Sequence, residues 1–262
     1  MTIADLIRKY IPSVKTIGCF ARITDITLKS DEELASLHRA GYDGLTIGIE
    51  TGDDEALRFM NKGYCAADIV TQCRRLDQAG IHYCFFYLVS ISGAGRGEIG
   101  AKATADVCNQ LHPQIIGANM LTIYPDSELY QEIQRGNWKE EGEIEKYKEI
   151  RALIENLTIP TQFAALGASN AFQLQGTLPE DKDALIRGIN HALAISIGLI
   201  EPAPPKLTFC LCGACADAFC GTGAFVLQKV TQEQAEKEVC TYCKQGAGER
   251  YAVRPKAGKG SV

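Results

Sequence analysis

Apolar and polar positions alternate along the first 200 residues in segments that predict strands and helices in turn. Apolar runs predict strands over residues 14–23, 45–49, 81–90, 115–123 and 159–164. Helical spacing and capping residues predict helices over residues 1–9, 30–40, 53–61, 66–79, 98–111, 127–135, 138–156 and 178–197. Strands that alternate with helices are typical of βαβ units on a parallel sheet, so the predicted fold class is α/β.

The segment around Glu50 carries the most information about a site. The run 45–49 predicts a short strand buried on both faces, and the polarity changes at Glu50, where this strand ends. Gly52 allows close backbone approach, Asp53 is predicted to cap the next helix, and Asn61-Lys62-Gly63 to end it. Ligands bind at the carboxyl ends of parallel strands, so Glu50 is a candidate site residue. The alternative is a helix-cap partner or a surface ion pair.

Two later segments are predicted to be peripheral. Residues 138–156 form a long, charged helix, which is expected to be a solvated outer face. Residues 167–176 are expected to form a loop before the last helix. For the charged helix, the alternative is a binding surface.

Composition limits the classes of partner. The chain has 262 residues, of which 46% are hydrophobic and 23% charged, and a net charge of −5. This charge gives no general attraction to nucleic acid. The opening residues do not form a secretion signal, and no segment approaches the roughly 18 to 20 apolar residues of a membrane span. A cytoplasmic protein without a membrane anchor is expected.

A change in composition predicts a second domain. Three prolines in the stretch Glu201-Pro-Ala-Pro-Pro205 favour a stiff, extended linker. The predicted organisation is an α/β domain over residues 1–200, a linker over 201–206, a cysteine-rich domain over 207–254 and a disordered tail over 255–262.

Four cysteines of the second domain have the spacing of a metal site. Cys212 and Cys215 form one C-x2-C pair, and Cys240 and Cys243 form another 24 residues later. This pattern predicts a four-thiolate zinc site built from two turns, with Gly213 and Gly246 easing them. Iron is chemically possible with the same four sulfurs. Metal binding would supply much of the folding free energy of so small a module.

The remaining cysteines lack ligand spacing. Cys210 and Cys220 are expected to be bystander thiols, with substitution as metal ligands as the alternative. The other five are expected to be small buried residues or surface thiols, namely Cys19, Cys65, Cys73, Cys84 and Cys108. Without a secretion signal, a disulfide network is disfavoured.

The order of motifs in the first domain resembles radical S-adenosylmethionine (radical SAM) enzymes of the elongator-like, methylthiotransferase-like and coproporphyrinogen-dehydrogenase-like subgroup. The similar pieces are Gly48-Ile-Glu-Thr-Gly52, Asn61-Lys-Gly63, Leu76-Asp-Gln-Ala-Gly80, Ser92-Gly-Ala-Gly95, Thr122-Ile-Tyr-Pro125 and Gly176-Thr-Leu-Pro-Glu-Asp-Lys182. The resemblance implies a partial (β/α) TIM-type barrel, and the cysteine-rich part resembles a zinc ribbon.

The resemblance also implies roles for individual residues. Glu50 matches the polar residue that binds the ribose hydroxyls of S-adenosylmethionine, with Gly52 beside it. Ile91 and Gly93 belong to the strand end that flanks the adenine. Thr122 and Tyr124 belong to the last strand end, which also lines the nucleoside pocket.

The family's iron–sulfur motif does not occur in this sequence. Radical SAM enzymes hold a four-iron four-sulfur cluster through C-x3-C-x2-C, and these 262 residues contain no such spacing. The resemblance begins after the point where that loop would lie, so the barrel is expected to lack its cluster-binding part and to leave an open edge that a protein partner could cover.

Two functions of different classes follow. The first is a radical SAM-family protein that binds S-adenosylmethionine as a small-molecule cosubstrate and generates radicals if a cluster is supplied. The second is a non-catalytic, zinc-binding scaffold or interaction protein derived from such an enzyme. Neither the substrate nor the choice between these functions follows from the sequence, and nucleic acid is not indicated as a partner.

Overall fold

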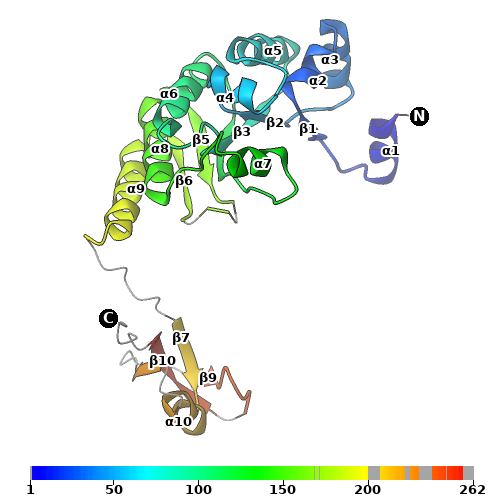
Figure 1. The fold of residues 1–262 in the computed structure, drawn as a ribbon. Coiled ribbons are helices and arrows are strands. Elements are labelled where there is room, and N and C mark those ends of the chain that lie inside the picture. The colour runs from blue at the N-terminus through cyan, green and yellow to red at the C-terminus, as the bar shows by residue number, and fades with distance from the viewer. Residues whose placement is uncertain are drawn as a thin grey trace. The chain divides into compact units, whose positions relative to one another are not determined.

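The chain divides into two compact units, residues 1–200 and 201–262, in a computed structural model (Figure 1). The structure describes residues 2–167, 169–170, 172–199, 207–221, 225–229, 238–245 and 247–255. The predicted linker over 201–206 lies outside the described residues, as do residues 256–262 of the predicted tail. Pro255, the first residue of that tail, instead ends a strand.

A single sheet organises the first unit. Its described residues form six strands in the order β1-β2-β3-β4-β5-β6. These are β1 (Phe20–Ala21), β2 (Leu45–Glu50), β3 (Tyr83–Val89), β4 (Ile115–Met120), β5 (Thr161–Ala165) and β6 (Leu174–Leu178). The first five are parallel and β6 is antiparallel to β5. Parallel strands in chain order form a partial (β/α) barrel of the TIM type, in agreement with the predicted fold class.

The first unit has nine helices among its described residues, and most of them connect successive strands or cover the outside of the sheet (Figure 1). They are α1 (Ile3–Tyr10), α2 (Ile23–Thr27), α3 (Asp31–Arg39), α4 (Asp54–Phe59), α5 (Ala66–Ala79), α6 (Gly97–Cys108), α7 (Glu128–Gln134), α8 (Glu143–Asn156) and α9 (Lys182–Ser196). Among them α5, α6, α8 and α9 pack against one another in chain order. Each crossover helix therefore lies beside the next, as a barrel wall requires.

Local capping explains why most helix ends were predictable. Ser30 accepts from the backbone N–H of Glu33, whose carboxylate accepts from the N–H of Ser30, so the predicted capping box forms. Asp53 caps α4 by accepting from the N–H of Glu55 at 3.0 Å. Gly80 ends α5 with a φ of 75°, which glycine adopts without steric cost.

Two predicted segments are wrong in detail. The strand expected over residues 14–23 shrinks to the two residues of β1, and Ile23 instead begins α2. Arg22 precedes that helix, and its backbone and guanidinium N–H groups donate to the Asp25 carboxylate, which favours the helical turn. The loop expected over 167–176 ends early, because β6 begins at Leu174 and pairs with β5.

The sheet is fully buried on one face only, which corrects the expectation for β2. Leu45, Ile47 and Ile49 are buried, whereas the alternate residues of β2 are half-buried. In β3 the same alternation buries Tyr83, Phe85, Tyr87 and Val89 and leaves Phe86 exposed. Successive strand residues point to opposite faces. The helices therefore cover one face, and the other stays open over the described residues.

The charged helix α8 is part of the core, against the prediction of a solvated face. Its buried residues are Lys146, Tyr147, Glu149, Ile150, Ala152, Leu153 and Ile154. The helix packs against α6, α9 and β3. The high charge of the helix obscured its apolar face. Buried Glu149 has partners, Tyr87 and Ser90, that only the tertiary structure supplies, whereas the largely buried Lys146 pairs with Glu140 nearby in the sequence.

A smaller sheet organises the second unit. It contains β7 (Leu207–Leu211), β8 (Phe225–Lys229), β9 (Glu238–Val239) and β10 (Ala247–Pro255), with helix α10 (Gly213–Gly221) after β7. The long strand β10 pairs antiparallel with the other three. The helix was not predicted: Gly213 starts it rather than easing a turn, and Gly246 lies outside the described residues.

We expect Gly52→Ala to destabilise the first unit by about 2 kcal/mol, the usual cost of overpacking. A Cβ at Gly52 would lie 2.5 Å from the carbonyl oxygen of Ala103 on α6, too close for any real contact. Urea unfolding followed by far-ultraviolet circular dichroism measures the loss.

Gly142→Ala is the matched control. A Cβ there would come no closer than 3.8 Å, to the side chain of Glu145. The unfolding midpoint of this variant should stay near that of the parent protein. Equal effects of the two substitutions would show that the close approach of α6 to Gly52 does not limit stability.

Candidate functional sites

A hollow of about 450 Å³ lies on the open face of the sheet, around Glu50. It is lined by residues of β1 to β4 and of the start of α2, namely Phe20, Ala21, Arg22, Asp25, Thr46, Gly48, Glu50, Phe86, Leu88 and Asn119. Phe20, Phe86 and Leu88 are apolar members of this lining, whereas Glu50 and Asn119 are polar. The hollow therefore combines an apolar floor with a few polar groups, as small-molecule sites do.

The backbone bends sharply at Glu50. Its φ is 62°, a left-handed conformation that residues other than glycine adopt rarely, and the pairing of β2 with β3 shifts register here. The Tyr64 hydroxyl donates to the carbonyl oxygens of Gly48 and Ile49, both at 3.2 Å, and so supports the bend. Strained backbone conformations of this kind are common at functional sites, where surrounding contacts maintain them.

Lys62 gives the Glu50 carboxylate a cationic partner. The Lys62 Nζ lies 3.3 Å from Glu50 Oε1, and the side chains are 30% and 20% exposed. The turn that ends α4 directs Lys62 here, since Asn61 and Gly63 both have positive φ. The alternative considered for Glu50, an ion pair, is thus present, although the sequence analysis did not name Lys62 as its partner. The ion pair leaves carboxylate lone pairs available to a ligand.

The other residues predicted to bind the cofactor lie in three places. Gly52 is buried, and its N–H donates to Thr104 Oγ1 at 2.7 Å, so its missing side chain makes room for α6. Thr122 and Tyr124 are exposed beyond the end of β4. Ile91 and Gly93 line a second hollow. The structure therefore does not bring these residues together with Glu50 in one cavity.

The second hollow measures about 220 Å³ and lies between α4 and the glycine-rich loop after β3. Its lining includes Phe59, Ile91, Gly93, Arg96 and Trp138. Trp138 contacts Gly93, where a Cβ would come within 2.9 Å of the indole Nε1. Arg96 forms ion pairs with Asp53 and Glu55, both at 3.0 Å, which largely neutralise it.

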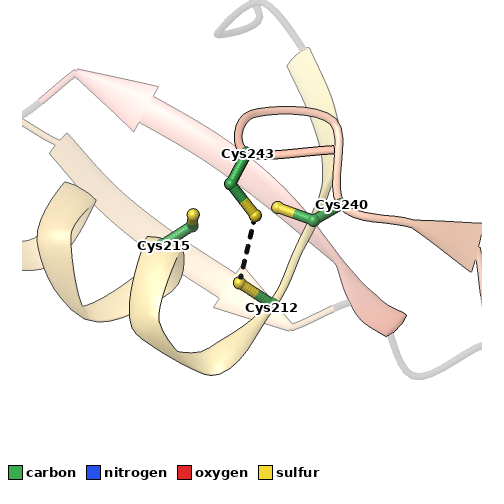
Figure 2. Close-up of side chains that lie close together, drawn as sticks. All are labelled: Cys212, Cys215, Cys240 and Cys243. Atoms are coloured by element: carbon green, nitrogen blue, oxygen red, sulfur yellow. Dashed lines mark hydrogen bonds between the residues drawn. The ribbon is translucent and has the colours of Figure 1, made fainter. Parts of the chain in front are cut away.

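Four sulfurs converge in the second unit (Figure 2). The Sγ atoms of Cys212, Cys215, Cys240 and Cys243 all lie within 4.8 Å of one another, and those of Cys212 and Cys243 are 3.8 Å apart. Cys212 lies between β7 and α10, Cys215 on α10, and the other pair on the turn after β9. Four thiolates at this spacing suit a tetrahedral metal ion.

The surroundings of these thiols favour a bound cation. Backbone N–H groups of Cys212 and Cys243 lower the pKa of the Cys240 thiol to about 6, because they stabilise its thiolate. Burial and the neighbouring thiols raise the pKa of Cys215 to about 12. Without a cation the four groups would therefore not all ionise. A divalent ion removes the repulsion, so the donor set fits zinc and, with the same geometry, iron.

Other cysteines stand apart from this cluster. Cys210 is buried on β7 and faces Gly248, whereas the Cys220 side chain lies outside the described residues. In the first unit Cys73 and Cys108 are buried and Cys19 is exposed, as expected of unrelated thiols. No described helix is long and apolar enough to cross a membrane.

A sequence comparison finds a family match within the first unit. Residues 3–99 match the profile of the radical SAM superfamily. These residues of the first unit are therefore similar to part of a radical SAM core. The match includes β1, β2 and β3, and therefore the strand end at Glu50, which agrees with the predicted resemblance. No curated protein matches the sequence.

Solved structures with similar folds include three proteins. They are the archaeal Methanocaldococcus infernus Elp3 with an N-terminal deletion (11% identity, TM-score 0.49, 82% of this chain and 50% of that one), methylornithine synthase PylB (14%, 0.40, 76% and 62%) and the cobalamin-dependent S-adenosylmethionine radical enzyme OxsB (13%, 0.34, 84% and 35%). The chain spans less than two thirds of the length of each. Similarity at this level carries no functional assignment.

The described residues of the radical SAM part do not fit the family's four-iron cluster. Within the part of the chain that the structure describes, only the four cysteines of the second unit form a group of three or more converging metal ligands. The cysteines of the first unit do not gather. No chemical step is therefore assigned here to an iron–sulfur cluster.

We expect the full chain to hold one zinc or iron ion, and Cys240→Ser to lose it, because a hydroxyl is a poor replacement for this thiolate. Elemental analysis of the purified protein gives the stoichiometry and the identity of the metal. Losing the metal should also unfold the second unit, which circular dichroism and limited proteolysis can detect.

Cys65→Ser provides the control, since Cys65 is a half-buried thiol of the first unit outside the cluster. Its metal content should equal that of the parent chain. Full metal occupancy in Cys240→Ser would contradict the four-thiolate site.

Proposed function

We propose that the first unit binds S-adenosylmethionine in the hollow on the open face of its sheet, with Glu50 accepting from the ribose hydroxyls. The observation that carries this proposal is the placement of Glu50: it ends β2 in a left-handed bend, lines the hollow and is only 20% exposed. A carboxylate can accept from two vicinal hydroxyls at once. The superfamily match over residues 3–99 supports the choice of cosubstrate.

The lining of the hollow supports a nucleoside-sized ligand. Its volume of about 450 Å³ suits a small molecule of this kind. Gly48 adjoins Glu50, and a Cβ there would lie 2.9 Å from Glu50 Oε1, so the missing side chain leaves the carboxylate free to turn. Phe86 and Leu88 of β3 offer an apolar surface for a ring.

Glu50→Gln should weaken S-adenosylmethionine binding about 10-fold to 100-fold, because an amide accepts more weakly than a carboxylate and hydrogen bonds to charged groups contribute roughly 1.5–3 kcal/mol. Isothermal titration calorimetry of the full, metal-loaded chain measures this. S-adenosylhomocysteine serves as a second ligand with the same ribose.

Glu98→Gln is the matched control, because Glu98 is an exposed glutamate on α6 outside both hollows. Its affinity should equal that of the parent chain. Equal affinities of Glu50→Gln and the parent would remove Glu50 from the site, and no binding of either ligand by the parent would reject the proposed function.

A second candidate function is a non-catalytic, metal-dependent scaffold. One observation favours it specifically: the only converging metal ligands of the described residues lie in the second unit, outside the radical SAM part. A chain that holds zinc but binds neither S-adenosylmethionine nor S-adenosylhomocysteine would match this function.

A further inference from the structure

Two buried carboxyl groups lie behind the end of β3, outside both hollows. Glu149 on α8 is 0% exposed, and Glu141, just before α8, is 5% exposed. Acidic side chains are rarely buried to this extent without a basic partner. Neither carboxyl has one among the described residues, because Lys146 pairs instead with Glu140 and Glu143.

These groups hold both ends of the loop from Ser90 to Gly97. Glu149 Oε2 accepts from the Ser90 N–H at 2.8 Å, and its Oε1 contacts the Tyr87 hydroxyl. Glu141 Oε1 accepts from the Gly97 N–H at 3.0 Å, and the Glu141 N–H donates to Ser90 Oγ at 3.1 Å. Ser90 itself has a φ of 75°, so these contacts maintain a strained turn.

The surroundings of the pair favour a proton on Glu149. Burial, and then the neighbouring Glu141, raise the pKa of Glu149 well above its usual value. Glu141 Oε2 is buried without a hydrogen-bond donor among the described residues, and a proton on the adjacent carboxyl would supply one. Two ionised carboxylates here would lack any compensating charge.

Other titratable groups near the pair do not supply that charge. Tyr87 of β3 contacts Glu149 but carries no positive charge. Asp53 interacts electrostatically with Tyr87, and its own charge is balanced by an ion pair with Arg96. On the helices that pack against α8, the charged residues Glu98, Lys102, Asp106, Asp183, Arg187 and His191 are exposed.

We propose that Glu141 and Glu149 share one proton, and that the protonated pair is a clamp that fixes the loop 90–97 on the end of β3 and releases it when the proton is lost. The loop carries Ile91 and Gly93 and forms one wall of the second hollow. The inference does not rest on the proposed function, since the clamp acts without any ligand.

The chain contains its own reporter of this loop. Trp138 is the only tryptophan of the sequence, and its indole contacts Gly93 at the centre of the loop. Release of the loop would expose the indole to water and shift its fluorescence to the red. The emission of the full, metal-loaded chain can be followed as pH rises under native conditions.

The decisive comparison is between the parent chain and Glu149→Gln, whose neutral amide imitates the protonated carboxyl. We expect an alkaline red shift in the parent and none in Glu149→Gln, with Glu98→Gln behaving like the parent. Ionisation of exposed tyrosines affects all three proteins equally. The same red shift in Glu149→Gln as in the parent would overturn the proposal, as would a parent emission that does not change with pH.

Stability provides a second readout. The pKa of Glu149 is raised on folding, so the parent binds an extra proton when folded and loses stability as pH rises above about 4.5, the ordinary value, until the folded-state pKa is passed. Over that interval the unfolding constant of the parent should rise tenfold per pH unit relative to Glu149→Gln. A ratio of the two constants that is independent of pH would overturn the shared proton.

Glu141→Gln tests the other carboxyl group of the pair. It also provides the comparison with the parent chain if Glu149→Gln fails to fold. Removing the neighbouring acid should move the fluorescence transition to lower pH, because Glu149 then ionises without a like charge beside it. An unchanged transition in Glu141→Gln would show that the two carboxyl groups are not coupled, and would also overturn the proposal.

Discussion

The first unit depends on side chains from the outer helices that hydrogen-bond the ends of its strands. At the ends of β2 and β3, Glu50 and Ser90 have positive φ. The N–H groups of Gly52 and Ser90 therefore need hydrogen-bond acceptors outside the neighbouring strands. The hydroxyl of Thr104 on α6 accepts from Gly52, and Glu149 on α8 accepts from Ser90. Buried N–H groups need such partners. The helices therefore determine where the loops, and the hollows that they line, are placed.

Features decided by local sequence were predictable, and those decided by distant contacts were not. Capping at Ser30 and the stop at Gly80 involve residues within one turn, so the pattern located α3 and α5 well. The extent of β1 depends on whether a neighbour pairs with it, which no local pattern reveals. The buried face of α8 was missed for a related reason: Glu149 is tolerated in the core only because Tyr87 and Ser90 lie opposite it.

The same distinction applies to the candidate sites. The four cysteines were identified from spacing, since two C-x2-C pairs bring their own ligands together whatever secondary structure surrounds them, and α10 did not disturb the set. Around Glu50 the sequence supplied one residue and missed its partners. Lys62 reaches the carboxylate through the turn after α4, and Asn119 reaches the same hollow from β4. Such a set forms only when parallel strands place their ends side by side.

The two units offer chemically different groups to a ligand. The second presents four thiols, and the first presents a carboxylate and an ammonium group. A four-thiolate site surrounds its metal completely, as structural sites do, and leaves no position for an organic ligand. A cluster that activates S-adenosylmethionine needs an open iron, so the cysteines of the second unit are no substitute for one. The first unit presents a carboxylate, an ammonium group and an apolar strand face, which suit an organic molecule with hydroxyls. The described residues therefore offer groups suited to a small ligand in the first unit and to a metal ion in the second.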